Sequence, residues 1–495
     1  MPGFFVENFG CRATQADGAA VERQFEERGW VRASSPELAS VVVLNTCTVT
    51  SGADQDARAA IRRVQRQNPD ARIVVTGCYA QRAPEEIAAL PGVDLVVGNS
   101  HKHALAEIAL AWPRGAKGFN SSFVSLSQLT EPVLSSEGPS EPSIFVSDIF
   151  AHTELVAAPV FDAANDRTRP NLKVQDGCDN RCSFCVIPFV RGQSRSLQLD
   201  HILHQVNTLV EAGYREVVIS GINLGRWGKD LDPRLRTSDF GPAVGLEIGG
   251  GPKSDFRRPT SASSHPTLAD LVGSILSETA LEKLRISSVE PMDWSDALIS
   301  LMASSPRIAK HAHVPMQSGN DAVLRRMHRK YRPWHYRRKI EKIRAAMPAA
   351  AIGADVMVGF PGETESEFEA TRTMIEELPF TYLHVFTYSA RPGTPARQMM
   401  NQVPPRVARD RNRILRALAA EKKLAFMRSF IGRTVEAITL NVAGKDSDGE
   451  YTEALTDNYL KLRLGGTHAA NRWLNATVND VVSGSLVGGL RENLH

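Results

Sequence analysis

The stretch KVQDGCDNRCSFCVIP (residues 173–188) sets three cysteines, Cys178, Cys182 and Cys185, at the spacing C-x₃-C-x₂-C. A structural zinc ion takes four protein ligands, and no fourth Cys or His follows Cys185 at a zinc-ribbon spacing. A 4Fe–4S cluster has four irons, so three thiolates leave one iron free to bind a substrate or cofactor. The stretch therefore predicts a cluster with an open iron, with a zinc site or a disulfide as the alternative.

The other three cysteines, Cys11, Cys47 and Cys78, all lie in the first eighty residues. Apolar, β-branched runs lead into two of them (41–47 and 71–78), a pattern typical of buried parallel strands. Because the carboxyl ends of parallel strands share one edge of an open α/β sheet, we expect the three thiols to meet there. The alternative is three buried core cysteines, which pack as small hydrophobic residues.

Residues 51–70, between these two strands, have a helical pattern with Ser51 as the expected cap. Six further strand-like segments alternate with helical stretches downstream. They are 172–177, 216–221, 284–291, 312–319, 351–364 and 382–389. Six such units predict a partial (β/α)₆ barrel, related to the full barrel in which active sites form where the strands end.

Composition sets limits on the class of protein. A chain of 495 residues suggests about three domains, and 42% hydrophobic with 23% charged residues is ordinary for a globular protein. No apolar run approaches the roughly 20 residues of a membrane span, and the N-terminus does not have the pattern of a signal peptide. We therefore expect a cytoplasmic protein with no membrane partner, whose cysteines are reduced.

Nucleic-acid affinity must come from local patches, because the net charge is only +3. Residues 325–344 hold ten Lys or Arg against one Glu, with Tyr331, Trp334 and Tyr336 among them. Residues 401–433 hold nine Lys or Arg against two acids. Both segments are predicted to contact phosphate, and the alternative is a solvated helix face.

The motifs together resemble one family, the radical S-adenosylmethionine methylthiotransferases. The resemblance rests on NTCTVT (45–50), VTGCYAQ (75–81), KVQDGCDNRCSFCVIP (173–188), HVPMQSG (313–319) and HVFTYSARPGTPA (384–396). Within the family, these words are most similar to the branch that modifies N6-threonylcarbamoyladenosine next to the tRNA anticodon. One departure is Thr14, where the family usually has Asn.

The resemblance implies an α/β protein of three folded parts. They are a methylthiotransferase domain (1–114), a radical domain (169–400) and a small C-terminal β-barrel of the TRAM type (432–495), the last supported by TDNYLKLRL (456–464). A linker (115–168) and a basic helical connector (401–431) would join them, and a Ser-, Gly- and Pro-rich insertion (229–266) would interrupt the radical domain.

The same resemblance implies two 4Fe–4S clusters and S-adenosylmethionine as cofactors. Cys178, Cys182 and Cys185 would hold the cluster that forms the radical, and Cys11, Cys47 and Cys78 would hold the cluster that carries the transferred sulfur. One molecule of S-adenosylmethionine would supply the methyl group and another the radical. Phe184, Ser220, Gly221 and Glu290 would lie around the cofactor.

The implied reaction inserts a methylthio group at C2 of the modified adenosine. Its partners would be the anticodon arm of tRNA, an electron donor such as flavodoxin or ferredoxin, and a sulfur donor. Three alternatives remain open: the same chemistry on isopentenyladenosine in tRNA, the same chemistry on an aspartate of a ribosomal protein, and a non-catalytic iron–sulfur protein that binds RNA or senses redox state.

Overall fold

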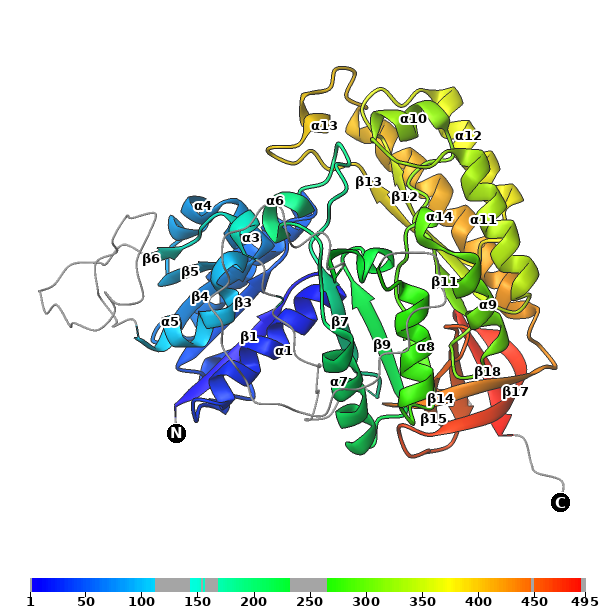
Figure 1. Ribbon diagram of the computed structural model, residues 1–495, viewed down its shortest axis with the longest axis horizontal. Helices are drawn as coiled ribbons and strands as arrows, with labels where there is room; N and C mark the ends of the chain where they lie inside the picture. Colours follow the sequence, from blue (N-terminus) through cyan, green and yellow to red (C-terminus); the bar gives the residue numbers. More distant parts are fainter. Residues whose placement is uncertain are drawn as a thin grey trace, which may run out of the picture.

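The computed structural model describes residues 2–111, 143–152, 155, 168–231, 265–446 and 449–490. An N-terminal α/β domain (blue), a central half-barrel (green to yellow), a long helix (orange) and a C-terminal β-barrel (orange to red) follow one another along the chain (Figure 1). This arrangement confirms the predicted α/β fold class. The predicted linker 115–168 and insertion 229–266 lie mostly outside the described residues.

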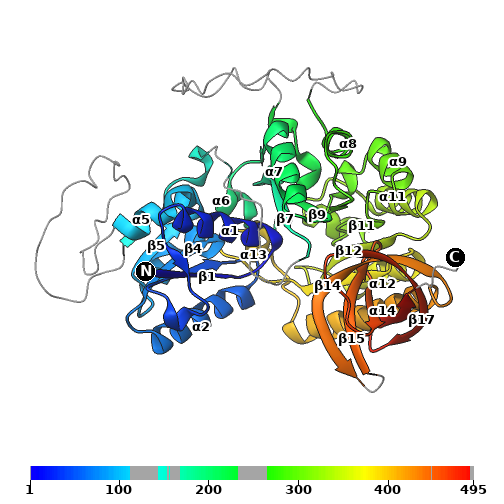
Figure 2. The ribbon, with the colours of Figure 1, turned by 90° about the horizontal axis from the view of Figure 1, so that it is seen from below.

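The N-terminal domain is a parallel sheet with the strand order β2-β1-β3-β4-β5-β6. The strands are β1 (Gly3–Asn8), β2 (Val31–Arg32), β3 (Val41–Thr46), β4 (Arg72–Gly77), β5 (Leu95–Gly98) and β6 (Ser143–Phe145). Helices α1 (Arg12–Glu26) and α5 (Leu105–Ala111) cover one face, and α2 (Ser51–Gln67), α3 (Cys78–Arg82) and α4 (Pro84–Ala88) cover the other (Figure 2). Since both faces are covered, the central strand β3 is buried along its whole length, as its apolar run predicts.

Two local predictions for this domain are wrong. Thr50, not Ser51, caps α2, because its hydroxyl accepts a hydrogen bond from the Ala53 amide at 3.2 Å. Both hydroxyl residues are good caps, so the sequence does not separate them. The strand Ser143–Phe145 lies in the range predicted as linker, yet it pairs with β5. A strand of three residues is too short to show a period-two pattern.

The central half-barrel combines two sheets, with the strand orders β10-β9-β7-β8 and β11-β12-β13. The strands are β7 (Asn171–Asp176), β8 (Arg195–Ser196), β9 (Glu216–Gly221), β10 (Lys283–Ile286), β11 (His311–His313), β12 (Ala351–Val358) and β13 (Tyr382–Thr387). The amide of Val289 donates to the carbonyl of His313 (3.1 Å) where the sheets adjoin. All six predicted strands are present, and β8 is an unpredicted antiparallel edge of two residues.

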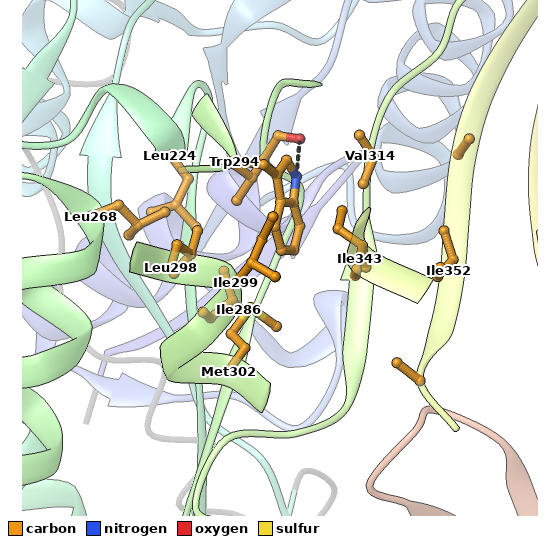
Figure 3. Packing of buried hydrophobic residues seen from close by; sticks show 14 of the residues in the cluster. Leu224, Leu268, Ile286, Trp294, Leu298, Ile299, Met302, Val314, Ile343 and Ile352 are labelled. Atoms are coloured by element: carbon orange, nitrogen blue, oxygen red, sulfur yellow. Dashed lines mark hydrogen bonds between the residues drawn. The ribbon is translucent and has the colours of Figure 1, made fainter. Parts of the chain in front are cut away.

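Helices surround the strands on the outside of the half-barrel. They are α7 (Leu199–Glu211), α8 (Leu268–Glu278), α9 (Asp296–Ser304), α10 (Asp321–Arg326), α11 (Pro333–Ala346) and α12 (Glu365–Glu377). The short helices α6 (Ile187–Arg191), which packs on α3, and α13 (Pro395–Gln398) lie outside this layer (Figure 1). Figure 3 shows part of the core between the strands and the surrounding helices, where Trp294 packs among aliphatic side chains and its indole nitrogen donates to the Val289 carbonyl at 3.1 Å. This apolar packing fixes the strands whose carboxyl ends carry the candidate site.

Helix α14 (Pro405–Arg428) packs on β13 and leads into a closed barrel in the order β14-β15-β16-β18-β17. The strands are β14 (Thr434–Asp446), β15 (Gly449–Thr456), β16 (Lys461–Gly465), β17 (Trp473–Val482) and β18 (Ser485–Leu490). The barrel docks on β10 of the half-barrel, where Lys283 pairs with Glu436 (2.5 Å) and Arg285 donates to the Asp457 carbonyl (2.9 Å). The small C-terminal barrel is therefore present as predicted.

Candidate iron–sulfur sites

Cys11, Cys47 and Cys78 lie at the carboxyl ends of three adjacent strands of the N-terminal sheet. Cys11 follows β1 by three residues, Cys47 directly follows β3, and Cys78 directly follows β4. Gly10 has a φ of +100°, and a Cβ atom there would lie 2.7 Å from Cβ of Cys47. Only glycine therefore lets the loop that carries Cys11 approach Cys47 so closely. The sheet brings the three thiols to one edge, as the sequence predicts.

The surroundings of this N-terminal triad suit a metal cluster. Cys47 and Cys78 are buried, Cys11 is exposed, and the side-chain amide of Asn99 donates to Sγ of Cys78 at 3.6 Å. Burial, and to a smaller degree the neighbouring Cys78, raises the pKa of Cys47 to about 12. Such a thiol is protonated and inert at neutral pH unless a bound metal compensates the thiolate charge.

Cys178, Cys182 and Cys185 lie on the loop between β7 and α6. The loop is held by backbone hydrogen bonds from the Cys178 amide to the Gly192 carbonyl and from the Cys185 amide to the Cys182 carbonyl, both 3.1 Å. Asn223 donates to Sγ of Cys178 at 3.6 Å. Burial raises the pKa of Cys185 to about 12. This triad thus has the same chemical character as the N-terminal one.

The spacing of the sulfur atoms separates a cluster from a single ion. Among the described side chains, neither cysteine triad has its three sulfurs within 4.8 Å of one another. A tetrahedral zinc ion, with bonds of 2.3 Å, would bring its sulfur ligands to about 3.8 Å. A 4Fe–4S cluster holds each thiolate on a different iron and so needs a wider spacing. At least one sulfur–sulfur distance in each triad thus exceeds 4.8 Å, which does not suit one shared zinc ion and is compatible with a cluster.

The four residues predicted to contact S-adenosylmethionine lie beside the second triad. Phe184 packs edge-on against Phe360, with ring centroids 6.3 Å apart. Ser220 and Gly221 end β9, and Glu290 follows β10. The Ser220 hydroxyl is buried with no hydrogen-bond partner among the described residues, so it is available to a bound polar group. Cofactor contact by these four residues stays a prediction.

Two family models match the chain. One, described as the Radical SAM superfamily, matches residues 172–375. The other, described as Uncharacterized protein family UPF0004, matches residues 3–98. The two matched ranges hold one cysteine triad each.

Curated relatives cover nearly the whole chain. The threonylcarbamoyladenosine tRNA methylthiotransferase MtaB of Bacillus subtilis is 34% identical over 458 residues, covering 92% of this chain and 89% of its own. The protein of the same name from Aquifex aeolicus is 33% identical, covering 93% and 96%. The chain belongs to the radical S-adenosylmethionine methylthiotransferases. Another relative in that family, the tRNA-2-methylthio-N(6)-dimethylallyladenosine synthase of Acidothermus cellulolyticus, is 32% identical, covering 97% and 84%.

A solved structure agrees with this methylthiotransferase at the level of the fold. The radical S-adenosylmethionine methyltransferase TsrM from Kitasatospora setae, with cobalamin and a [4Fe-4S] cluster bound, has a TM-score of 0.51 and 14% identity. The match covers 80% of this chain and 74% of that one. As a methylthiotransferase, the chain uses two iron–sulfur clusters and S-adenosylmethionine, and the two cysteine triads are the side chains that suit the clusters.

The basic segment 325–344 forms the predicted surface only in part: Arg325, Lys330, Arg338 and Lys342 are exposed, whereas Arg329 is not. Arg329 is buried, forms an ion pair with Glu290 and donates to Sγ of Cys182 at 3.4 Å. Tyr331 and Tyr336 are also buried, and of the three aromatic residues only Trp334 is exposed. Arg329 therefore belongs to the surroundings of the radical triad, and its substitution would not test contact with RNA. Charge and aromatic content alone do not distinguish a buried arginine from an exposed one.

Five buried charged side chains, here called the interdomain charge network, join the two cysteine-bearing domains. They are Asp17 and Lys102 from the N-terminal domain and Lys173, Asp176 and Arg191 from the radical domain. Lys173 forms ion pairs with both acids, and Arg191 lies 3.0 Å from each. Burial by itself raises the pKa of Asp17, but the three cations lower it to about 2. Asp17 is therefore ionised at neutral pH.

The interdomain charge network stands next to both triads, because Asp17 is six residues after Cys11 and Asp176 is two residues before Cys178. It therefore fixes how the two candidate cluster sites face each other. Sequence reasoning did not identify this network. The available signal was the presence of Lys173 and Asp176 in a strand predicted to be buried, where charges require partners.

A second contact between the domains lies beside Cys47. Arg391, on the loop after β13, donates to the Thr48 hydroxyl at 2.8 Å and forms an ion pair with Asp54. Arg82 reaches the same carboxylate at 3.1 Å. The loop that carries the ARPGTPA motif is thereby held against the N-terminal triad. No described helix is both long and apolar enough to cross a membrane.

Proposed function

We propose that this chain is a tRNA methylthiotransferase that inserts a methylthio group at C2 of N6-threonylcarbamoyladenosine next to the anticodon. The observation that carries the proposal is the pair of cysteine triads, each three thiols with no fourth cysteine, fixed next to each other by the interdomain charge network. The names of the relatives from Bacillus subtilis and Aquifex aeolicus support the substrate. The isopentenyl branch is the second candidate, represented by the Acidothermus relative.

The residues of the chain divide the work between two sites. In the proposal, Cys178, Cys182 and Cys185 hold the cluster that binds S-adenosylmethionine, with Phe184, Ser220, Gly221 and Glu290 around the cofactor. Cys11, Cys47 and Cys78 hold the cluster that carries the sulfur. When bound, these groups supply the radical and sulfur chemistry that an unreactive C–H bond of adenine requires. The Arg329–Glu290 ion pair orients both side chains beside Cys182.

The proposal also names partners. The reaction consumes electrons and sulfur, so we infer an electron donor such as flavodoxin or ferredoxin and a separate sulfur donor. We infer that it takes place in the cytoplasm on folded tRNA. The target base must leave the anticodon stack to reach both clusters, as it does in other enzymes that modify bases.

Deleting the gene is expected to remove 2-methylthio-N6-threonylcarbamoyladenosine from total tRNA and to let its unthiolated parent accumulate. The measurement is mass spectrometry of nucleosides from cells with and without the gene. The wild-type gene should restore the product, and a Cys182→Ala gene should not. If the methylthio-isopentenyl nucleoside disappears instead, the proposed reaction is correct but the proposed substrate is wrong. No change in either nucleoside would favour a protein substrate.

Helix α14 supplies a second basic surface in addition to the exposed cations of the segment 325–344. Five of its exposed cations are Arg406, Arg409, Arg413, Arg416 and Lys423. Their spacing of three, four, three and seven residues places them on one face of the helix. The buried Arg411 on another face anchors the helix, because it pairs with Glu363 at 2.9 Å. We infer that this basic face contacts phosphates of the tRNA.

Replacing Arg409, Arg413 and Arg416 together by Gln is expected to weaken tRNA binding and to lower the slope of log affinity against log salt by about two. Fluorescence anisotropy at several salt concentrations measures both quantities. The matched control replaces Arg23, Arg28 and Arg32 by Gln, because each of these exposed arginines is paired with a glutamate. An equal change of slope in both triple variants would contradict the assignment to α14.

A further inference from the structure

Arg12 is a half-buried arginine that directly follows Cys11 and begins helix α1. One end of its guanidinium donates to the Tyr459 hydroxyl of the C-terminal barrel at 3.4 Å. Its backbone carbonyl accepts from Asn171 at the start of β7 (3.0 Å), so the helix end is held against the half-barrel. Among the described residues, no carboxylate lies within the 4.0 Å of an ion pair from Arg12. A partly desolvated cation of this kind suits an anionic ligand.

A row of polar rings continues from Tyr459 up the inner face of the half-barrel. The row, together with one carboxylate, is here called the lumen wall. Its rings are His311, His313, Tyr382 and His384 on strands β11 and β13, and its carboxylate is Asp355 on β12. The Tyr459 ring lies 4.6 Å from His311 and 6.3 Å from Tyr382, measured between centroids. Tyr382 in turn lies 5.4 Å from His384. The wall is therefore continuous from Arg12 to the middle of β13.

The lumen wall carries hydrogen-bonding groups in place of an apolar lining. Ligand atoms of His313, Asp355 and His384 lie within 4.8 Å of one another, and Nε2 of His313 lies 3.4 Å from a carboxylate oxygen of Asp355. Burial lowers the pKa of His384, and neighbouring His313 lowers it further, so a neutral His384 ring can donate one N–H and accept at the other nitrogen. Asp355 adds an acceptor. An apolar substituent would offer no hydrogen bond to any of these groups.

We propose that Arg12 and the lumen wall form the pocket for the N6 substituent of the target adenosine, with Arg12 binding a carboxylate on that substituent. This inference rests on the proposed function and makes it more specific. A threonylcarbamoyl group offers one carboxylate, one hydroxyl and ureido N–H groups, which match one cation, the imidazoles and Asp355. An isopentenyl group offers none of these. Arg12 thus places the substituent directly beside Cys11 of the sulfur-carrying site.

The first experiment varies the carboxylate of the N6 substituent. Three synthetic anticodon stem-loop RNAs differ only at the target base: threonylcarbamoyladenosine, its threoninol analogue with a hydroxymethyl in place of the carboxylate, and adenosine. Their affinities for the reconstituted full-length chain are measured by fluorescence anisotropy for wild type, Arg12→Lys, Arg12→Gln and the exposed control Arg62→Gln. Iron content is measured in parallel, to establish that the Cys11 site loads equally in each variant.

Wild type and Arg62→Gln are expected to bind the carboxylate RNA about 10- to 100-fold more tightly than the threoninol RNA, the usual effect of one hydrogen-bonded charge. Arg12→Gln should bind both equally, and Arg12→Lys should keep most of the preference. An Arg12→Gln chain that loads iron and keeps the full preference would overturn the pocket. A wild-type chain without any preference would overturn it as well.

A second variant, His384→Phe, keeps a ring at an exposed position and removes both nitrogens. It should bind the threonylcarbamoyl RNA several-fold more weakly and bind the adenosine RNA unchanged. Loss of one bound zinc with unchanged RNA preference would instead assign His313, Asp355 and His384 to a metal ion and overturn the pocket. The proposed function is tested separately by the nucleoside analysis. A different product there would contradict it, whatever the result for the Arg12 variants.

Discussion

Replacing Cys185 by alanine is expected to remove about four iron atoms per chain and to leave the iron bound by the N-terminal triad in place. The corresponding variant Cys78→Ala is expected to lose the iron bound by the N-terminal triad and to keep the iron bound by Cys178, Cys182 and Cys185. The reason is that the two triads are built on separate elements, the loop after β7 and the strand ends of the N-terminal sheet. Methylthio transfer should fall below detection in both variants. Iron analysis and electron paramagnetic resonance of the reconstituted proteins provide the measurement.

The two cysteine variants should differ in one further reaction. Reduced Cys78→Ala protein should still cleave S-adenosylmethionine to 5′-deoxyadenosine, whereas Cys185→Ala protein should not. The double variant, with about eight iron atoms lost, is the control for residual binding. Loss of all iron in either single variant would mean that the two sites do not load independently. Cleavage by neither Cys78→Ala nor wild type would support the non-catalytic alternative.

Replacing Arg191 by methionine is expected to lower the free energy of unfolding by about 3–5 kcal/mol at pH 7, because it leaves buried acids without their cation. Arg191 is 2% exposed and lies 3.0 Å from both Asp17 and Asp176. Chemical denaturation followed by tryptophan fluorescence measures the change. Limited proteolysis should also cut the Arg191→Met chain faster between the two domains, since the network holds them together.

The stability lost in the Arg191→Met variant should become smaller as the pH falls. In the folded wild type the pKa of Asp17 is lowered to about 2 and that of Asp176 is also lowered, so both acids stabilise the fold above their ordinary pKa. The contribution of Asp17 is complete above about pH 4 and is lost as the pH falls toward 2, and that of Asp176 is lost at still lower pH. The difference between wild type and Arg191→Met should narrow over the same range.

The matched control for Arg191→Met is Arg63→Met, which breaks the half-exposed pair with Glu7. It should lower the free energy of unfolding by at most about 1 kcal/mol, the usual contribution of a surface ion pair. Equal losses in the two variants would contradict the special role of the interdomain charge network. A difference that stays constant down to pH 2 would contradict the ionisation of Asp17.

Periodicity and cysteine spacing were sufficient to predict the strands, the fold class and the meeting of the N-terminal thiols. Runs such as 41–47 and 71–78 are buried on both faces, so local composition and tertiary position agree. The error at Ser51 has a different cause, since capping depends on the backbone angle of a single residue. The strand at 143–145 depends on a neighbour in the sheet, which no local pattern reports.

The residues that sequence reasoning missed act through partners far away in the chain. Arg12 meets Tyr459 across 447 residues, and Lys173 meets Asp17 across 156. Arg329 was predicted to face RNA because its segment is basic, but Glu290 and the Cys182 sulfur neutralise it inside the protein. A single sequence contains the charges but not their pairing, so these roles become visible only once the fold brings the partners together.

The interdomain charge network also determines which parts of such an enzyme can be exchanged between lineages. A foreign N-terminal domain without an acid at position 17 would bury Lys173 and Arg191 with only Asp176 as a counter-charge. The C-terminal barrel docks through the backbone carbonyls of Thr456 and Asp457 and also through the side chains of Glu436 and Tyr459. Recombination should therefore accept a new C-terminal barrel only where it supplies counterparts of Glu436 and Tyr459, while the two cysteine-bearing domains are inherited as a single unit.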